Sequence, residues 1–119
     1  MTDNQHILDQ IRTHLHQAYN LDADRIKALL PGFLSALSGY VDEMEAALAN
    51  NNQDELVRSA HRIKGALVNL GLQDLAGRAL ILEQCARSPD TSAKDPEMTS
   101  QAAELAREIR RLLACQAAS

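Results

Sequence analysis

Residues 58–71 read RSAHRIKGALVNLG, and this stretch has the pattern of an amphipathic helix. Apolar residues recur in it every three or four positions, which is the spacing of one face of an α-helix. Gly71 follows the last apolar residue, where a left-handed C-cap is commonly glycine. The stretch also groups a histidine, two arginines, a lysine and a mid-helix glycine. A plain bundle helix needs no such grouping, so the outer face of this helix is a candidate site.

Helical spacing extends on both sides of this stretch and predicts five helices and no strand. The predicted helices span residues 3–19, 22–50, 53–70, 72–87 and 96–115. The second helix carries one continuous apolar stripe, which Pro31 and Gly32 interrupt without shifting. A kink is therefore expected at this point, and not a reversal of the chain.

Capping signals mark where two of these helices begin. Asn52 followed by Glu55 resembles a capping box ahead of the third helix. Asp95 reads as an N-cap, with Pro96 as the first helical residue of the fifth helix. The preceding stretch SPDTSAKDPE, residues 88–97, is rich in turn residues and predicts a loop.

Short loops between helices with one apolar stripe each predict an all-α fold, an antiparallel four-helix bundle. The second to fifth helices would form the bundle, and the N-terminal helix would cap it or lie across one end. A chain of 119 residues is long enough for one domain, so residues 1–119 are predicted to form one. No segment is apolar for long enough to span a bilayer, and the N-terminus does not read as a signal peptide.

Composition narrows the function classes. The formal net charge is −4 and aromatic residues make up only 3%, which argues against nucleic acid as a partner. Cys85 and Cys115 have no metal-like spacing, so free thiols and a cytoplasmic setting are expected. The chain contains no Glu-x-x-His pair of the kind that builds a di-iron bundle.

His61 falls off the apolar stripe of its helix, so its ring is expected to lie largely in solvent at the edge of the buried seam. Its neighbours on the helix surface, three and four residues away, are Val57, Arg58, Lys64 and Gly65. An imidazole is a good nucleophile near neutral pH, and Lys64 and Arg58 could offset the charge of a phosphate. Gly65 costs the helix about 1 kcal/mol relative to alanine but leaves space for a partner beside the histidine. The chemistry that fits is phosphoryl transfer.

The stretch AHRIKGALVNLGLQDLA, residues 60–76, resembles the signature of histidine-containing phosphotransfer (HPt) domains of bacterial multistep phosphorelays. The shared core is H-x-x-K-G at residues 61–65, followed by N-L-G at residues 69–71 and L-E at Leu82 and Glu83. Upstream, LLPGFL resembles the pattern of that family's second helix. The resemblance covers residues 26–87.

This resemblance implies a four-helix bundle that relays a phosphoryl group. His61 would accept the group, on Nε2, from a receiver-domain aspartate and pass it to a response-regulator aspartate. Lys64 would give electrostatic support, and Gly65 would admit the partner. The resemblance implies a phosphocarrier without an ATP site or autokinase activity, because the chain shows none of the glycine boxes of a kinase domain.

The expected partners are the receiver domains of a hybrid sensor histidine kinase and of a response regulator, with no nucleic acid and no membrane. The expected partner-binding residues are Arg58, Arg62, Val57, Val68 and Arg78. The chain is expected to be a monomer and to need no cofactor of its own, with Mg²⁺ carried by the receiver alone.

Other interpretations of the same residues stay open. The chain could be a helical adaptor that binds a kinase or receiver without carrying phosphate, or a bundle that binds a metal or cofactor. Arg58 and Arg62 could belong to a solvated basic face, and Gly65 could permit tight helix packing. The remaining histidines, His6, His14 and His16, are interpreted as surface residues, and the carboxylates Asp42, Glu43 and Glu45 as a solvated face.

Overall fold

The computed structural model describes residues 3–88 and 95–118, which form five helices. These are α1 (Asp3–Tyr19), α2 (Ala23–Ala49), α3 (Gln53–Asn69), α4 (Gln73–Arg87) and α5 (Pro96–Ala118). No strand occurs in the described ranges, so the predicted all-α class is confirmed. The loop expected at residues 88–97 falls mostly outside these ranges.

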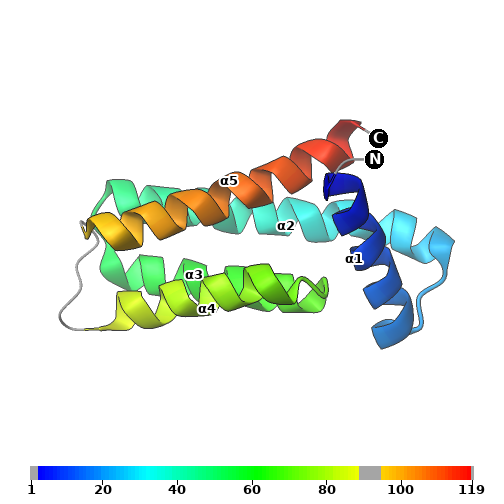
Figure 1. Ribbon diagram of the computed structural model, residues 1–119, viewed down its shortest axis with the longest axis horizontal. Helices are drawn as coiled ribbons and strands as arrows, with labels where there is room; N and C mark the ends of the chain where they lie inside the picture. Colours follow the sequence, from blue (N-terminus) through cyan, green and yellow to red (C-terminus); the bar gives the residue numbers. More distant parts are fainter. Residues whose placement is uncertain (1–2, 89–94, 119) are drawn as a thin grey trace.

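Helices α2 to α5 lie side by side along the long axis of the molecule, and α1 lies across one end, as expected (Figure 1). Helix α2 runs without a break through Pro31, so the chain does not reverse there. The predicted kink at this proline stays a prediction. No helix in the described part of the chain is both long and apolar enough to cross a membrane.

The core between the helices is aliphatic. Its largest fully buried side chains are Leu8, Ile11, Leu15, Leu30, Leu37, Met44, Leu56, Ile63, Leu67, Leu82, Met98 and Leu105. Burial of such side chains is the main force that holds amphipathic helices together. Among the residues that the structure describes, the buried polar ones are Ser59 and Glu83, and of these two Glu83 carries an ionisable group.

Asparagines connect α2 to α3. Asn51 adopts a left-handed φ of 55°, which asparagine tolerates better than most residues. The turn closes through hydrogen bonds from the N–H of Asn51 to the Leu48 carbonyl, 3.2 Å, and from the N–H of Asn52 to the Ala47 carbonyl, 2.9 Å. The Asn52 side chain then accepts a hydrogen bond from the N–H of Glu55, 3.2 Å, which is the predicted cap of α3.

Gly71 closes the turn between α3 and α4 with a φ of +78°. Its N–H donates to the Val68 carbonyl at 3.0 Å, and the N–H of Leu72 donates to the Leu67 carbonyl at 2.9 Å. This is the hydrogen-bond pattern of a Schellman motif, which confirms the predicted glycine cap. The turn folds α4 back along α3, so residues in the middle of the two helices face one another.

Helix α1 packs on this turn, and one sequence-based interpretation is corrected there. The ring of His14 lies so close to Gly71 that a Cβ on residue 71 would overlap it. His14 is therefore half-buried and not a simple surface residue, and its ring also meets Tyr19 edge to face. Gln10 Nε2 donates to the Gly71 carbonyl at 3.2 Å, and Tyr19 Oη donates to Asn69 Oδ1 at 3.3 Å.

The acidic side chains of α2 are exposed, and some of them also form ion pairs. Arg110 of α5 pairs with Asp42 at 2.7 Å and also with Glu45, and these hydrogen bonds raise the pKa of Arg110. Glu43 pairs with Arg62 of α3 at 2.8 Å. The interpretation of this face as solvated is confirmed, because all three carboxylates are exposed, and ion pairs also connect it to both neighbouring helices.

Candidate functional site

His61 lies in the middle of α3, and 60% of its side chain is exposed. Nδ1 of the ring lies 3.1 Å from Oε2 and 3.3 Å from Oε1 of Glu83 on α4. The expected exposure is confirmed. The anchor on the neighbouring helix was not anticipated, because helical spacing alone does not show which residue of another helix a side chain meets.

Glu83 is the centre of a small charged cluster. Its side chain is only 6% exposed, on the inward side of α4. Lys64 Nζ lies 3.3 Å from Oε1, and Arg87 Nη2 lies 2.8 Å from Oε2, one helical turn along α4. Burial raises the pKa of Glu83, but the hydrogen bonds and charges of His61 and Lys64 lower it further, and the net result is a lowered pKa. The carboxyl group is therefore ionised at neutral pH.

An ionised carboxylate can only accept hydrogen bonds, so the Nδ1 that faces Glu83 carries the proton. In a neutral imidazole the other nitrogen, Nε2, then holds the free lone pair. The cluster thus fixes both the orientation and the tautomer of His61. What it presents to solvent is an oriented nitrogen nucleophile.

Gly65 lies one turn beyond His61, and a Cβ added there would meet no heavy atom within 4 Å outside its own helix. Tight helix packing therefore does not require a glycine at this position, and that interpretation is wrong. The bare backbone beside His61 faces open space. Its role in admitting a partner stays a prediction.

The two arginines near His61 are exposed and already paired. Arg58 donates to Glu55 Oε2 from Nε at 3.1 Å and from Nη2 at 2.8 Å. Arg62 donates to Glu43 Oε2 at 2.8 Å. Since these carboxylates offset both charges, the surface beside His61 is less basic than its sequence indicates. Lys64 differs from the arginines because its only carboxylate partner among the described residues is Glu83 itself.

The other predicted partner-binding residues divide between two sides of the molecule. Val57 is half-buried against the core, and Val68 is 44% exposed on α3. Arg78 lies on the side of α4 that faces α5, where its guanidinium pairs with Glu108 at 2.8 Å. The structure does not bring Arg78 beside His61, because the angular position of a residue on α4 decides which neighbouring helix it meets.

Sequence reasoning missed a groove between α2 and α3, next to Gly65. Its volume is about 260 Å³. The lining residues are Phe33, Ala36, Tyr40, Arg62, Gly65, Ala66, Asn69 and Leu70. Phe33, an apolar residue of α2, is 40% exposed at this groove. The sequence did carry a sign of this groove. The apolar stripe of α2 is wider than one buried face requires, which indicates that some of its residues are exposed.

Within the described ranges, no three His, Cys, Asp or Glu side chains gather closely enough to hold a metal ion. Cys85 is a half-buried free thiol. The side chain of Cys115 lies outside the described part of the structure.

The helical bundle displays an exposed imidazole that a buried carboxylate of the neighbouring helix holds in place. The chain belongs to the Hpt domain family, because the family model described as Hpt domain matches residues 28–115, about three quarters of its length. Hpt domains are phosphocarrier modules that interact with receiver domains in phosphorelays. A role in phosphotransfer follows from this membership. No curated protein and no solved structure matched the chain.

Proposed function

We propose that the protein is a phosphorelay intermediate that accepts a phosphoryl group on Nε2 of His61 and passes it on. The donor would be the aspartyl phosphate of a hybrid sensor kinase's receiver domain, and the acceptor the aspartate of a response regulator. One observation carries the proposal: Glu83 holds Nδ1 of His61, which leaves Nε2 as the exposed nucleophile. Membership of the Hpt family supports it.

In the proposed transfer, the bond between phosphorus and the donor aspartate oxygen breaks as the bond from Nε2 to phosphorus forms. The donor carboxylate leaves with its electron pair. The proton stays on Nδ1, so the phosphorylated ring carries a positive charge. Glu83, 3.1 Å from Nδ1, stabilises that charge. The same steps in reverse deliver the group to the second receiver.

Lys64 is the proposed electrostatic support for the incoming phosphoryl group. Its ammonium group lies 3.3 Å from Oε1 of Glu83, and 27% of the Lys64 side chain is exposed, so the group can turn toward a phosphate without leaving the cluster. The proposal assigns Mg²⁺ to the receiver alone and gives this chain no ATP site. Incubation with labelled ATP and no partner should therefore leave it unlabelled.

The proposed docking surface is the flank of α3 that faces α2. There the open backbone at Gly65 borders the groove that holds Phe33 and Tyr40. The groove ends at Asn69, which is about 12 Å along α3 from His61. A partner interface of standard size, about 800 Å² per side, covers both the nucleophile and this groove. We therefore keep Arg62 and Val68 among the proposed contacts and omit Arg78.

The testing experiment mixes the full chain with a receiver domain that carries labelled aspartyl phosphate. Acid-labile, base-stable label is expected on the wild-type chain and not on its His61→Gln variant. Equal labelling of both proteins would remove His61 from the role. Receiver binding without any label would favour the adaptor function, which needs no anchored tautomer. The proposed bacterial cytoplasmic setting and the proposed monomeric state rest on the resemblance and the composition. Light scattering tests the monomeric state.

A further inference from the structure

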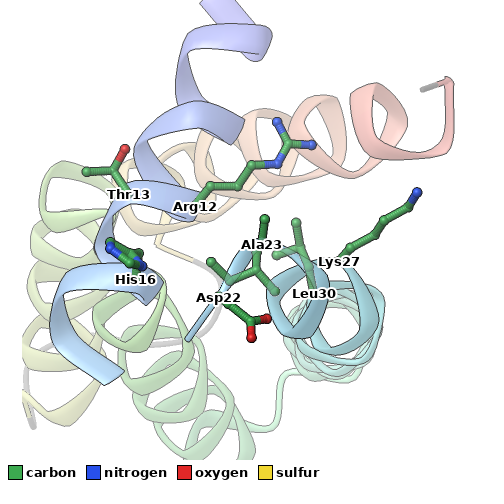
Figure 2. A pocket seen from close by; sticks show the side chains of 8 residues that line it. Arg12, Thr13, His16, Asp22, Ala23, Lys27 and Leu30 are labelled. Carbon is green, nitrogen blue, oxygen red and sulfur yellow. The ribbon is translucent and has the colours of Figure 1, made fainter. Parts of the chain in front are cut away.

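A second hollow lies between α1 and the first part of α2 (Figure 2). That part of α2 extends beyond the turn between α3 and α4 (Figure 1). Its volume is about 880 Å³, which falls within the range of pockets that bind small molecules. Thr13 and His16 line it from α1, and Ala23, Ile26 and Leu30 line it from α2. None of these residues belongs to the cluster around His61.

The floor of this hollow is apolar and fixed in place. Ile26 and Leu30 are buried, only 5% and 2% exposed, so they support the floor but offer little surface themselves. The apolar surface open to a ligand comes mainly from Ala23, Thr13 and the aliphatic stems of the lining cations. Ala23 and Thr13 have short side chains, which keeps the space above the floor open. From Ala23 to Leu30 the floor runs for about 10 Å along α2. An apolar group of that length could lie against it.

Two cations stand at the rim, one from each helix. Figure 2 shows Arg12 and Lys27 extended on the same side of the hollow. Arg12 has one exposed contact with Asp9 at 3.3 Å, a pair of the kind that contributes little. Lys27 has no ion pair with any residue that the structure describes. Two cations at an apolar hollow are notable in a chain of net charge −4.

The acidic residue of the lining does not cancel these charges. Asp22 Oδ1 accepts a hydrogen bond from the N–H of Arg25 at 2.8 Å, because Asp22 is the N-cap of α2. In Figure 2 its carboxylate points away from the side where the two cations extend. His16 is also engaged, through Nδ1 and the Leu21 carbonyl at 2.9 Å.

We propose that this hollow binds a small amphiphilic anion. The apolar body of the ligand lies over Ala23 and the aliphatic stems of Arg12 and Lys27, and its carboxylate or sulfate group lies between the two cationic groups. The site is independent of the proposed phosphotransfer, since it uses other residues and other helices.

The test is an NMR titration of the full chain with sodium decanoate below its micelle concentration. Saturable shifts with 1:1 stoichiometry are expected at Thr13, Ala23 and Ile26, and not at His61. Decyltrimethylammonium has the same apolar chain with the opposite charge and should bind at least tenfold more weakly. His61→Gln should bind decanoate as the wild type does, so failure of the phosphotransfer proposal would leave this result unaffected.

Variants of the rim residues test whether decanoate binds through the two cations or only adsorbs through its apolar chain. Arg12→Gln and Lys27→Gln should each weaken decanoate binding about three- to fivefold, and together about tenfold. Arg25→Gln is the matched control, because Arg25 is exposed on the same turn of α2 but does not line the hollow. Ala23→Phe fills the hollow and should abolish binding while the thermal unfolding temperature stays near that of the wild type.

Three results would overturn the proposal. The first is no saturable shift up to the micelle concentration. The second is equal binding by the wild type and the Arg12→Gln/Lys27→Gln double variant. The third is co-sedimentation with phosphatidylglycerol vesicles in the absence of any decanoate binding, which would assign the two cations to a membrane surface instead.

Discussion

Nδ1 of His61 lies 3.1 Å from Oε2 of Glu83, so one buried carboxylate of α4 holds the exposed imidazole of α3. This contact is the geometric basis of the proposed nucleophile. It makes Glu83 a positioning residue, because it acts on the reaction through His61. It also separates two properties of His61 that variants can test, the presence of its ring and the orientation of that ring.

Glu83→Ala removes the anchor and leaves His61 in place. We expect transfer from a phosphorylated receiver to slow about tenfold or more, because the ring is then free to rotate and to change tautomer. Glu83→Gln keeps an acceptor for the Nδ1 proton but loses the negative charge, so its transfer rate should lie between those of the wild type and Glu83→Ala. Single-turnover labelling measures these rates. Wild-type speed in Glu83→Ala would show that the contact has no part in transfer.

Variants at Gly65 can test the docking of a receiver separately from the phosphoryl-transfer step. Because a Cβ there meets open space, Gly65→Ala should raise the free energy of unfolding by about 0.5–1 kcal/mol. Gly65→Leu should fold equally well but slow transfer from a receiver about tenfold or more, since its side chain occupies the proposed interface. Labelling by phosphoramidate, a small donor, should be unchanged.

Gly77→Leu is the matched control for this prediction. Gly77 is also an exposed mid-helix glycine with open space around it, but it lies on α4 and away from the groove between α2 and α3. The rate of phosphoryl transfer from a receiver to Gly77→Leu should equal the rate to the wild type. If both leucine variants slowed transfer alike, the docking surface would have to be placed elsewhere.

Lys64→Gln should slow transfer from a receiver about three- to tenfold, because one charge-assisted contact to the phosphoryl group is lost. Arg78→Gln removes a cation that pairs with Glu108 toward α5, so we expect no effect on transfer from it. Rates from the same labelling assay distinguish the two variants. If Arg78→Gln slowed transfer more than Lys64→Gln does, Arg78 would have to be included in the partner-binding surface.

Stability should depend on pH through Glu83. Its pKa is lower in the folded protein than the ordinary value of 4.5, so its contribution to stability is full above that value. The contribution is lost as the pH falls through the folded-state pKa. Urea unfolding of wild type and Glu83→Gln at about pH 7 and about pH 3 measures this. The stability advantage of the wild type should shrink at the lower pH, and a constant difference would contradict the charged cluster.

Gly71→Ala should destabilise the protein for two separable reasons. A left-handed conformation costs a non-glycine residue about 1–2 kcal/mol. The new Cβ also overlaps the ring of His14. In a His14→Gly background, which removes both the ring and the Cβ of residue 14 that a Cβ on residue 71 would meet, only the first cost remains. Gly71→Ala should therefore lose less stability there, by about 1 kcal/mol or more. Equal losses in both backgrounds would show that α1 does not press on the turn.

The sequence predicted the features that depend on local spacing. The helices, the glycine cap at Gly71 and the exposure of His61 all follow from periodicity and capping rules that act within a few residues. Glu83 shows where such reasoning stops. It occupies an inward position between Leu82 and Ala86, and an acidic residue in an apolar stripe indicates a buried partner without naming it.

The contacts that sequence reasoning missed are all contacts between helices. Arg78 faces α5 and not His61, and His14 is half-buried against Gly71. Periodicity gives the angle of a side chain about its own helix axis. It does not give the register or rotation of one helix against another, which the packing of all the helices decides together.

The turn at Gly71 has a consequence for how the site forms. His61 and Glu83 are 22 residues apart, and a single helical hairpin, α3 followed by α4, supplies every member of the charged cluster. Little chain entropy is lost in bringing such near neighbours together, so contacts of this kind form early and rapidly in folding. We therefore expect His61 and Glu83 to come together as one local unit, so that changes elsewhere in the bundle can alter stability while leaving this contact intact.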